Sequence, residues 1–521
     1  MDMSKITRRE FNKRITAGLF GAAAVGSGIL SLDSFAKESS RNKRPNFVFV
    51  CSDQHSAKYN SFAGHPFVKT PSLDRIAKNG VAFTSAYCGS PLCVPGRSCM
   101  ITGMYASDVN SFCNSTVYDG SYPTWGKRLR DSGYYCRATG KQDLNPAFDL
   151  GFDEVDVSHG HAANPDITSL FRRPVGYRMK EREEIDGTVR EKRHNDQTTA
   201  HRVINFIRNE TKKTDKPWAL FVGLLEPHPA WSGLKEYFDY YLHKVEPPAI
   251  SIDELDQLPL SYQVMRNFKR ISTPIPEEKI KRAMAAYLSM VSELDEYIQE
   301  IYKSLEETNQ LDNTYFIYTS DHGESFGAHG MWLKGNLYEE AANIPLVISG
   351  PGLPKGRVIN LPVSHVDLVA TIIELAGIKI PEELRGTSLL PLVNGKTGAG
   401  PQFVYSESHC EGNSTGSFMI RKGDWKLIHF SYYGDYLFNL KEDPDEKRNR
   451  IDNSSAKDAA KELRDILYKQ VNPEEITQRA FVLQDKILKS FANKMNEEEL
   501  FEKFRSRLGD GQARILTNKL F

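Results

Sequence analysis

The sequence has no excess of charge of either sign and very little cysteine. Among its 521 residues, 67 Lys and Arg balance 67 Asp and Glu, so the formal net charge is zero. A general electrostatic attraction for nucleic acid is thereby excluded, and an anionic ligand would need a local basic pocket. The seven cysteines are too sparse for a disulfide scaffold and lack the paired spacing of metal sites. We expect most of them to be buried apolar residues, with Cys93 as the exception.

Long apolar runs are also lacking beyond the first forty residues, so no later segment is expected to insert stably into a membrane. The N-terminal residues contain the pair Arg8-Arg9, a weakly apolar stretch over about 17–32, and small residues before Ala36. This pattern predicts a twin-arginine export signal over 1–36 and a periplasmic location. An ordinary secretory signal or a short membrane anchor is the alternative interpretation.

Short apolar runs alternate with helical patterns from about residue 46 onwards. Runs rich in β-branched and aromatic residues predict buried strands at 46–51, 134–139, 218–224 and 314–319. Apolar residues at three- and four-residue spacing predict a helix over about 276–305, and a shorter helix ends within 371–377. The alternation indicates an α/β fold with a mainly parallel sheet flanked by helices.

The pattern changes after about residue 398. The stretch "FMIRKGDWKLIHF" followed by "YLFNLKEDPDE" predicts a small antiparallel meander, and the charged residues after it predict helices. We therefore expect a main domain over 44–400 and a smaller C-terminal α+β subdomain over 401–521. The stretches 143–200 and 230–275 are long and polar, and such loops often carry substrate contacts.

Reactive polar residues follow the four predicted strands. Asp53 follows the first strand, Lys141 the second, His228 the third, and Asp321 with His322 the fourth. Ligands of open parallel sheets bind outside the carboxyl ends of the strands, so we expect these side chains to converge. Two carboxylates and a histidine suit a divalent metal, and a lysine with a second histidine can neutralise an anion.

The stretch "PLCVPGRSCMITG", from Pro91 to Gly103, adds a nucleophile candidate. Pro95 fits the first turn of a helix, which places Cys93 at the helix N-terminus, where negative charge is favoured. Arg97 lies one turn further on the same face. A thiolate nucleophile normally needs a neighbouring base, and the sequence shows no obvious one.

The motif Cys-Val-Pro-Gly-Arg, followed by Ile-Thr-Gly, resembles the signature of the type I, formylglycine-dependent sulfatases of the alkaline-phosphatase superfamily. The resemblance continues along nearly the whole chain in the family's order, through "FVCSDQH", "GYYCRATGK", "EPHPAW", "YTSDHGESFGAHGMWLKGN", "HVDLVATIIELAGI" and "RGTSLLP". It implies an alkaline-phosphatase-like α/β fold and an enzyme that hydrolyses O-sulfate esters of a sulfated carbohydrate.

The resemblance also implies a modified residue and a metal. In the family the motif cysteine is oxidised to formylglycine by a formylglycine-generating or anaerobic sulfatase-maturating enzyme. One hydroxyl of the hydrated aldehyde attacks sulfur, and the other later expels sulfate. Carried over to this chain, Cys93 is the nucleophile and a metal ligand, and the other ligands of one calcium are Asp53, Asp321 and His322.

Four further side chains match catalytic positions of the family. Arg97 corresponds to the residue that steadies the aldehyde hydrate. Lys141, His228 and Lys334 correspond to the side chains that bind the sulfate and the leaving group. His228 is expected to protonate the departing alkoxide, because a histidine can hold a proton near neutral pH.

The chain departs from many relatives at several of these positions. Ser52-Asp53 stands where many have two aspartates, and His322 stands where many have asparagine; both are similar to the choline-sulfatase-like branch. An imidazole ligand leaves the choice between calcium and magnesium open. The tetrad Gly-Lys-Gln-Asp, ending at Asp143, is similar to the arylsulfatase K type, which removes 2-O-sulfate from uronates, so uronate 2-O-sulfate or a similar glycan sulfate is the expected substrate. Gly96 replaces a common serine, which we expect a helix start to tolerate.

Position alone indicates further substrate contacts. Asp143, His55 and Asn145 lie shortly after predicted strands. Trp231 follows closely after His228 in the sequence and could stack on a sugar ring of the substrate. Two of these have structural alternatives, because Asp143 could pair with the preceding lysine and Trp231 could be a core residue. In the polar loops, His161 and Arg172 are weaker candidates, whereas His329 and His365 are expected to be loop or packing residues.

Two other functions remain open at this point. One is a phosphonate monoester or phosphodiester hydrolase of the same superfamily, which can share the modified cysteine. The other is a catalytically silent binder of sulfated glycans, if Cys93 is never oxidised. The particular sugar, the sulfate position, exo or endo action and the oligomeric state do not follow from the sequence.

Overall fold

The computed structural model describes residues 44–145, 147–156 and 178–520. The expected export signal and the candidates His161 and Arg172 lie outside the described residues. None of the helices within these ranges combines the length and apolar character needed to cross a bilayer. Residues 44–521 group into one compact unit.

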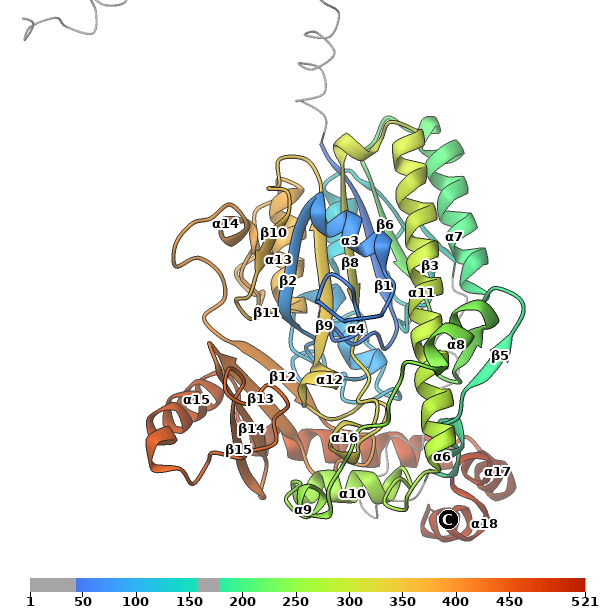
Figure 1. Ribbon diagram of the computed structural model, residues 1–521, viewed down its shortest axis with the longest axis vertical. Coiled ribbons are helices and arrows are strands. Elements are labelled where there is room, and N and C mark those ends of the chain that lie inside the picture. Colours follow the sequence, from blue (N-terminus) through green and yellow to red (C-terminus); the bar gives the residue numbers. More distant parts are fainter. Residues whose placement is uncertain (1–43, 146, 157–177, 521) are drawn as a thin grey trace, which may run out of the picture. The chain divides into compact units, whose positions relative to one another are not determined.

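A large, mostly parallel sheet lies at the centre of the molecule (Figure 1). Its strands follow the order β10-β2-β9-β8-β1-β6-β3-β4, with β11 paired to β2, and β9 is the strand that runs antiparallel to both neighbours. The bounds are β1 (Asn46–Ser52), β2 (Gly80–Tyr87), β3 (Tyr135–Gly140), β4 (Glu154–Asp156), β6 (Trp218–Gly223), β8 (Thr314–Ser320), β9 (Asn343–Ser349), β10 (Arg357–Ile359) and β11 (Val363–Ser364). The four strands predicted from the sequence are β8, β1, β6 and β3, which are neighbours in the sheet. The predicted α/β fold is confirmed.

Helices cover both faces of this sheet, which is why its central strands are apolar throughout. Val48 and Val50 of β1 pack on one face with side chains of α3, α7 and α11. Phe47 and Phe49 pack on the other face with side chains of α4, α5 and α13. Burying each such large side chain stabilises the fold by about 1.5–3 kcal/mol. The helix bounds are α3 (Pro71–Lys78), α4 (Cys93–Thr102), α5 (Trp125–Asp131), α7 (Asp196–Asn205), α11 (Glu277–Glu307) and α13 (His365–Leu375).

The predicted helices are confirmed. The expected helix over 276–305 is α11. The shorter helix that was expected to end within 371–377 is α13, which begins at a capping box formed by Ser364 and Asp367. The polar stretches contain more regular structure than expected: α6 (Met179–Glu184), α8 (Lys235–Leu242), α9 (Ile252–Asp256), α10 (Leu260–Phe268) and the strand pair β5 (Thr188–Arg190) and β7 (Ser232–Leu234).

The C-terminal part forms a four-stranded antiparallel sheet followed by helices, as expected from its sequence. The strands are β12 (Val404–Ser408), β13 (Ser417–Lys422), β14 (Trp425–Phe430) and β15 (Gly434–Asn439). The helices are α15 (Lys457–Gln470), α16 (Pro473–Ala492), α17 (Glu497–Leu508) and α18 (Asp510–Leu520). Leu500 and Phe504 of α17 pack in one cluster with Leu92, which precedes α4. The domain boundary at residue 400 stays a prediction.

Candidate active site

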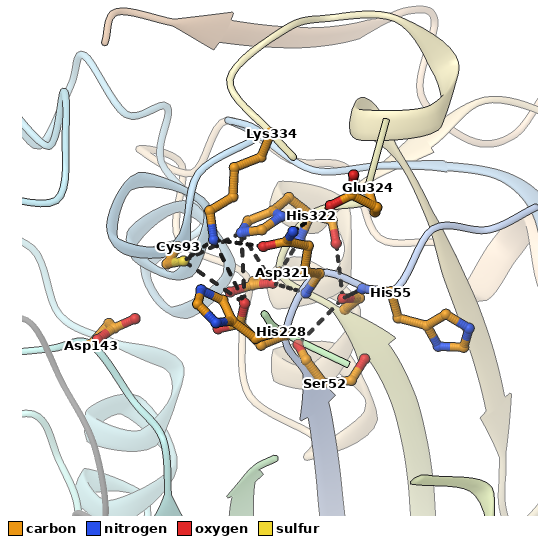
Figure 2. Close-up of polar contacts among 12 residues, drawn as sticks. Ser52, His55, Cys93, Asp143, His228, Asp321, His322, Glu324 and Lys334 are labelled. Atoms are coloured by element: carbon orange, nitrogen blue, oxygen red, sulfur yellow. Dashed lines mark hydrogen bonds and ion pairs between the residues drawn. The ribbon is translucent and has the colours of Figure 1, made fainter. Parts of the chain in front are cut away.

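Four side chains from three parts of the sequence meet at the carboxyl ends of β1 and β8 (Figure 2). Ser52 is in register with Ser320 in this parallel pair, so the residues that follow, Asp53 and Asp321, lie side by side. His322 and the first residue of α4, Cys93, complete the group. The ligand atoms of the four residues all lie within 4.8 Å of one another, and all four residues are buried. The predicted convergence is therefore what the structure shows.

The Cys93 thiol lies among acidic and basic side chains. Its Sγ is 3.4 Å from Nε2 of His322, 3.8 Å from Oδ1 of Asp53 and 3.0 Å from Nζ of Lys334. Leu92 before it is extended, so Cys93 occupies the first position of α4 as predicted. A reactive group at residue 93 would thus be in contact with a carboxylate, an imidazole and an ammonium group.

Arg97 binds the two carboxylates from one turn further along α4. Its Nε donates to Oδ2 of Asp321 at 2.9 Å and its Nη2 to Oδ2 of Asp53 at 3.3 Å. Its Nη1 donates to the carbonyl of Lys141 at 2.8 Å. The side chain is almost fully buried, and such a guanidinium is a fixed counter-charge for the carboxylates. In the structure its hydrogen bonds hold the carboxylates of Asp53 and Asp321 in place.

The two carboxylates differ in their electrostatics. Burial and the charge of Asp53 raise the pKa of Asp321 to about 6. Burial and Cys93 oppose the ionisation of Asp53, but Lys141 and other basic groups hold the pKa of Asp53 below its ordinary value. Two desolvated carboxylates at this distance repel each other, and a bound cation relieves that repulsion.

Two lysines and a histidine surround the same group. Nζ of Lys141 forms an ion pair with Asp53, and Lys334 contacts Cys93 as described. His228 is half-buried, and Figure 2 shows its ring beside Cys93 and Lys334. Burial and the charge of Lys334 lower the pKa of His228. The structure thus brings together every residue that was predicted to be catalytic.

Gln54 is a residue that the sequence analysis missed. Its backbone N–H donates to Oδ1 of Asp321 at 3.0 Å, and its side-chain Oε1 accepts from Nζ of Lys334 at 2.8 Å. Ser52 stands where many relatives have a second aspartate, and its hydroxyl lies 3.0 Å from the Tyr318 hydroxyl. Gln54, the residue after Asp53, is the one that contacts Asp321 and Lys334. Its position directly after Asp53 in "SDQH" was the sequence signal that could have identified it.

Two predicted substrate contacts are corrected to structural residues. Both ring nitrogens of His55 are bound within the protein, Nδ1 at 2.6 Å from the Tyr318 hydroxyl and Nε2 at 3.0 Å from the Tyr59 carbonyl. Figure 2 shows its ring turned away from the group. Trp231 is buried, and its Nε1 donates to the Pro227 carbonyl at 3.1 Å.

The remaining candidates lie near β3 or within the core. Asp143 is buried, with Oδ2 3.2 Å from Nζ of Lys141, as its structural alternative predicts. Asn145 accepts from the backbone N–H of Ala147 at 3.0 Å, and its role toward substrate stays a prediction. His365 is a packing residue as expected, because its Nε2 is 2.9 Å from the Ser320 carbonyl in the core. The other expected packing residue, His329, stacks on a tyrosine ring.

The donor set fits a divalent cation. It offers two carboxylates, an imidazole and residue 93, all buried, and the amide oxygen of Gln54 lies close by. Hard cations such as calcium and magnesium prefer oxygen donors, and an imidazole is also accepted by softer metals. Among the described residues, two other groups of potential metal ligands contain three residues each. The group of Asp53, Cys93, Asp321 and His322 is therefore the largest of the three.

The sequence matches two family models and several known proteins along most of its length. The family model described as Sulfatase matches residues 45–378, and the one described as N-sulphoglucosamine sulphohydrolase, C-terminal, matches residues 327–473. The chain is 30% identical to choline-sulfatase of Rhizobium meliloti (strain 1021), over 79% of this chain and 83% of that protein. It is also 30% identical to arylsulfatase K of Homo sapiens, over 82% of each chain.

Solved structures support the fold. A 2-O GAG sulfatase superposes with a TM-score of 0.67 at 22% identity, over 84% of this chain and 94% of that one. The phosphonate monoester hydrolase of Agrobacterium radiobacter superposes with a TM-score of 0.68 at 22% identity, over 82% and 96%. At these identities the likeness concerns the fold.

Proposed function

The chain belongs to the sulfatase family and is a sulfuric ester hydrolase, and from that premise we propose that it hydrolyses an O-sulfate ester of a sulfated carbohydrate, with uronate 2-O-sulfate as the preferred group. The observation that carries the proposal is the buried group at the strand ends, where Cys93 adjoins three potential metal ligands and two lysines.

The proposal includes a modified residue and a cation. Asp53, Asp321, His322 and residue 93 would hold one divalent cation, for which we propose calcium. When bound, the cation would offset negative charge on the sulfate oxygens. Converted to formylglycine by a maturating enzyme, residue 93 would supply a hydrated aldehyde as the nucleophile.

The two lysines provide fixed positive charge for the sulfate group. Although burial opposes it, the neighbouring Cys93 and Asp53 raise the pKa of Lys334 above its ordinary value, so the ammonium persists at neutral pH. Its Nζ lies 3.0 Å from Sγ of Cys93, within reach of a sulfate oxygen held at that residue. Charges placed before the reaction need no reorganisation as charge builds up on those oxygens.

His228 is the proposed proton donor to the leaving alcohol. Its Nδ1–H donates to the carbonyl of Pro229, so in the protonated imidazolium form the proton available to the ester oxygen is the Nε2–H. Its half-buried position keeps it accessible from outside while Cys93 is buried. An alkoxide is a poor leaving group, so proton transfer at Nε2 contributes most for sugar sulfates.

The substrate class is supported by the relatives. Arylsulfatase K aligns over most of the chain, and one structural neighbour is titled a 2-O GAG sulfatase. A panel of defined sulfated disaccharides, choline sulfate, an aryl sulfate and a phosphonate monoester tests the proposal. We expect the largest kcat/KM on a 2-O-sulfated uronate. A preference for choline sulfate or for the phosphonate monoester would overturn it, and binding without turnover by protein carrying formylglycine would favour the silent binder.

We also propose export to the periplasm, on the basis of Arg8-Arg9 and the weakly apolar residues that follow. Replacing both arginines with lysine should retain the protein in the cytoplasm. Unchanged periplasmic recovery of that variant in cell fractions would contradict this route.

A further inference from the structure

A buried carboxylate that the mechanism does not use lies three residues after Asp321. Glu324 has no exposed surface and accepts three hydrogen bonds. Its Oε1 accepts from the backbone N–H groups of Phe326 at 2.9 Å and Leu333 at 2.7 Å. Its Oε2 accepts from the side-chain amide of Gln54. The carboxylate therefore joins the loop after β8 to the residue after Asp53.

These bonds continue to the catalytic lysine. Oε1 of Gln54 accepts from Nζ of Lys334 at 2.8 Å. The same Nζ is 3.0 Å from Sγ of Cys93, and Figure 2 shows this contact. Leu333, whose N–H is bound by Glu324, directly precedes Lys334. Glu324 thus restrains the lysine at its backbone and, through Gln54, at its ammonium group.

We propose that Glu324 is a positioning residue that orients the Gln54 amide, and through it the ammonium group of Lys334, toward residue 93. The proposal rests on the proposed function, because it assigns a catalytic purpose to the place of Lys334. It does not depend on the identity of the sugar.

The direction of the hydrogen bonds explains why a carboxylate is needed. An ionised carboxylate only accepts hydrogen bonds, so Gln54 must turn its NH2 group to Glu324. The carbonyl oxygen of Gln54 is then left facing Lys334, which can only donate. Reversing the amide would place two donors against each other in a buried site, which is costly.

The substitution E324Q tests this directionality with almost no change of shape. To keep the two backbone N–H groups bonded, the new amide must place its oxygen where Oε1 was, and its NH2 group then faces the NH2 group of Gln54. We expect Gln54 to reverse and displace Lys334. Because a small displacement of a group at the reacting centre slows the reaction strongly, kcat/KM should fall by about 10- to 100-fold, mainly through kcat.

A reciprocal exchange provides the rescue. In the double variant E324Q/Q54E the amide at 324 donates to a carboxylate at 54, whose other oxygen accepts from Lys334, and the buried charge is conserved. We expect it to recover at least about tenfold in kcat/KM over E324Q. A purely structural role for Glu324 in the loop predicts no such recovery, because E324Q keeps both backbone bonds.

The matched control is D295N. Asp295 of α11 is a buried carboxylate that accepts from the backbone N–H groups of Ser72 and Leu73, at 2.8 and 2.9 Å, outside the site. We expect D295N to lower the melting temperature while kcat/KM stays within about twofold of the wild type. A loss of kcat/KM in D295N as large as that in E324Q would attribute the effect to general destabilisation and overturn the proposal.

Crystal structures of the variants separate this proposal from the proposed function. We expect Nζ of Lys334 to lose its hydrogen bond to residue 54 in E324Q and to regain it in E324Q/Q54E. This result does not depend on whether the wild type hydrolyses a given sulfate. An unmoved lysine in E324Q, wild-type kcat/KM in E324Q, or a double variant no faster than E324Q would overturn the proposal. So would full recovery of E324Q by added calcium alone, because the substitution would then act through the cation.

Discussion

At the scale of residues, the site consists of buried charges that neutralise one another. Asp53 lies 3.3 Å from Nη2 of Arg97, forms an ion pair with Lys141, and lies 4.0 Å from Nζ of Lys334. Removing one member of such a set leaves its partner desolvated and unpaired, which costs more than the lost contact itself. Single neutralising substitutions here therefore test stability as well as catalysis, whereas His228 can be changed at lower structural risk because it is half-buried.

The substitution His228→Asn should slow sugar sulfates about 10²- to 10⁴-fold, the usual contribution of a general acid. The rate on nitrophenyl sulfate should fall much less, because the nitrophenolate leaving group needs no proton. Steady-state kcat/KM on both substrates measures the difference. Equal losses on both substrates would assign His228 to sulfate binding and not to proton transfer.

The same residue sets a pH dependence. Burial and the charge of Lys334 lower the pKa of His228, so the protonated form is lost as pH rises through a value below the ordinary one. For sugar sulfates we expect kcat/KM of the wild type to fall as pH rises through that lowered value, and this limb of the profile to be missing in His228→Asn. An identical limb in the variant would show that another group titrates there.

At the scale of elements, the central strands were predictable and the details around them were not. Strands such as β1 are buried on both faces, so their residues are apolar almost throughout. The positions of Asp53 and Asp321 at the sheet edge could be predicted because each residue comes directly after such an apolar run. Lys334 came only from the family resemblance, because it lies in a loop without periodicity. His55 and Trp231 were misassigned because the direction of a side chain after a strand depends on its partners in space.

Helix α4 has glycine at residue 96, where a serine is common among relatives and where glycine was expected to be tolerated. A Cβ atom at this position would lie 2.7 Å from the Ser90 carbonyl oxygen and 2.8 Å from that of Asp321. Both are backbone atoms that cannot turn aside. The helix that carries Cys93 therefore approaches the end of β8 as closely as it does because residue 96 is glycine.

Gly96→Ala should push α4 away from β8 and reduce kcat/KM by about 10- to 100-fold, since displacement of a reacting group by about 1 Å is that costly. The matched control is Gly511→Ala in α18, where a Cβ meets nothing within 4 Å and activity should be unchanged. Both variants are measured by steady-state kinetics and thermal unfolding. Wild-type activity of Gly96→Ala would show that the helix can shift without affecting the site.

At the scale of the whole molecule, the C-terminal sheet supports the catalytic loops. Oγ of Ser408 donates to the Gly335 carbonyl at 2.7 Å, and the Gly335 N–H donates to the Pro91 carbonyl at 3.0 Å. The loops that carry Lys334 and Cys93 are thereby tied to each other and to β12. We infer that the site requires both parts of the chain to be folded.

Cation binding should couple to this global stability. A ligand that binds only the folded state at 100 times its dissociation constant stabilises it by about 2.7 kcal/mol. We therefore expect a chelator to lower both the melting temperature and the activity, and calcium to restore both. In Asp321→Asn the calcium-dependent shift of the melting temperature should shrink. An equal melting temperature with chelator and with calcium would contradict a cation at this site.

The most direct test of the account is the rate of sulfate release from a sulfated sugar, measured by ion chromatography for the wild type and Cys93→Ala, each co-produced with a maturating enzyme. We expect the wild type to release sulfate and Cys93→Ala to be slower by on the order of 10³-fold or more. Release at the wild-type rate by Cys93→Ala would contradict the assignment of residue 93 as the nucleophile.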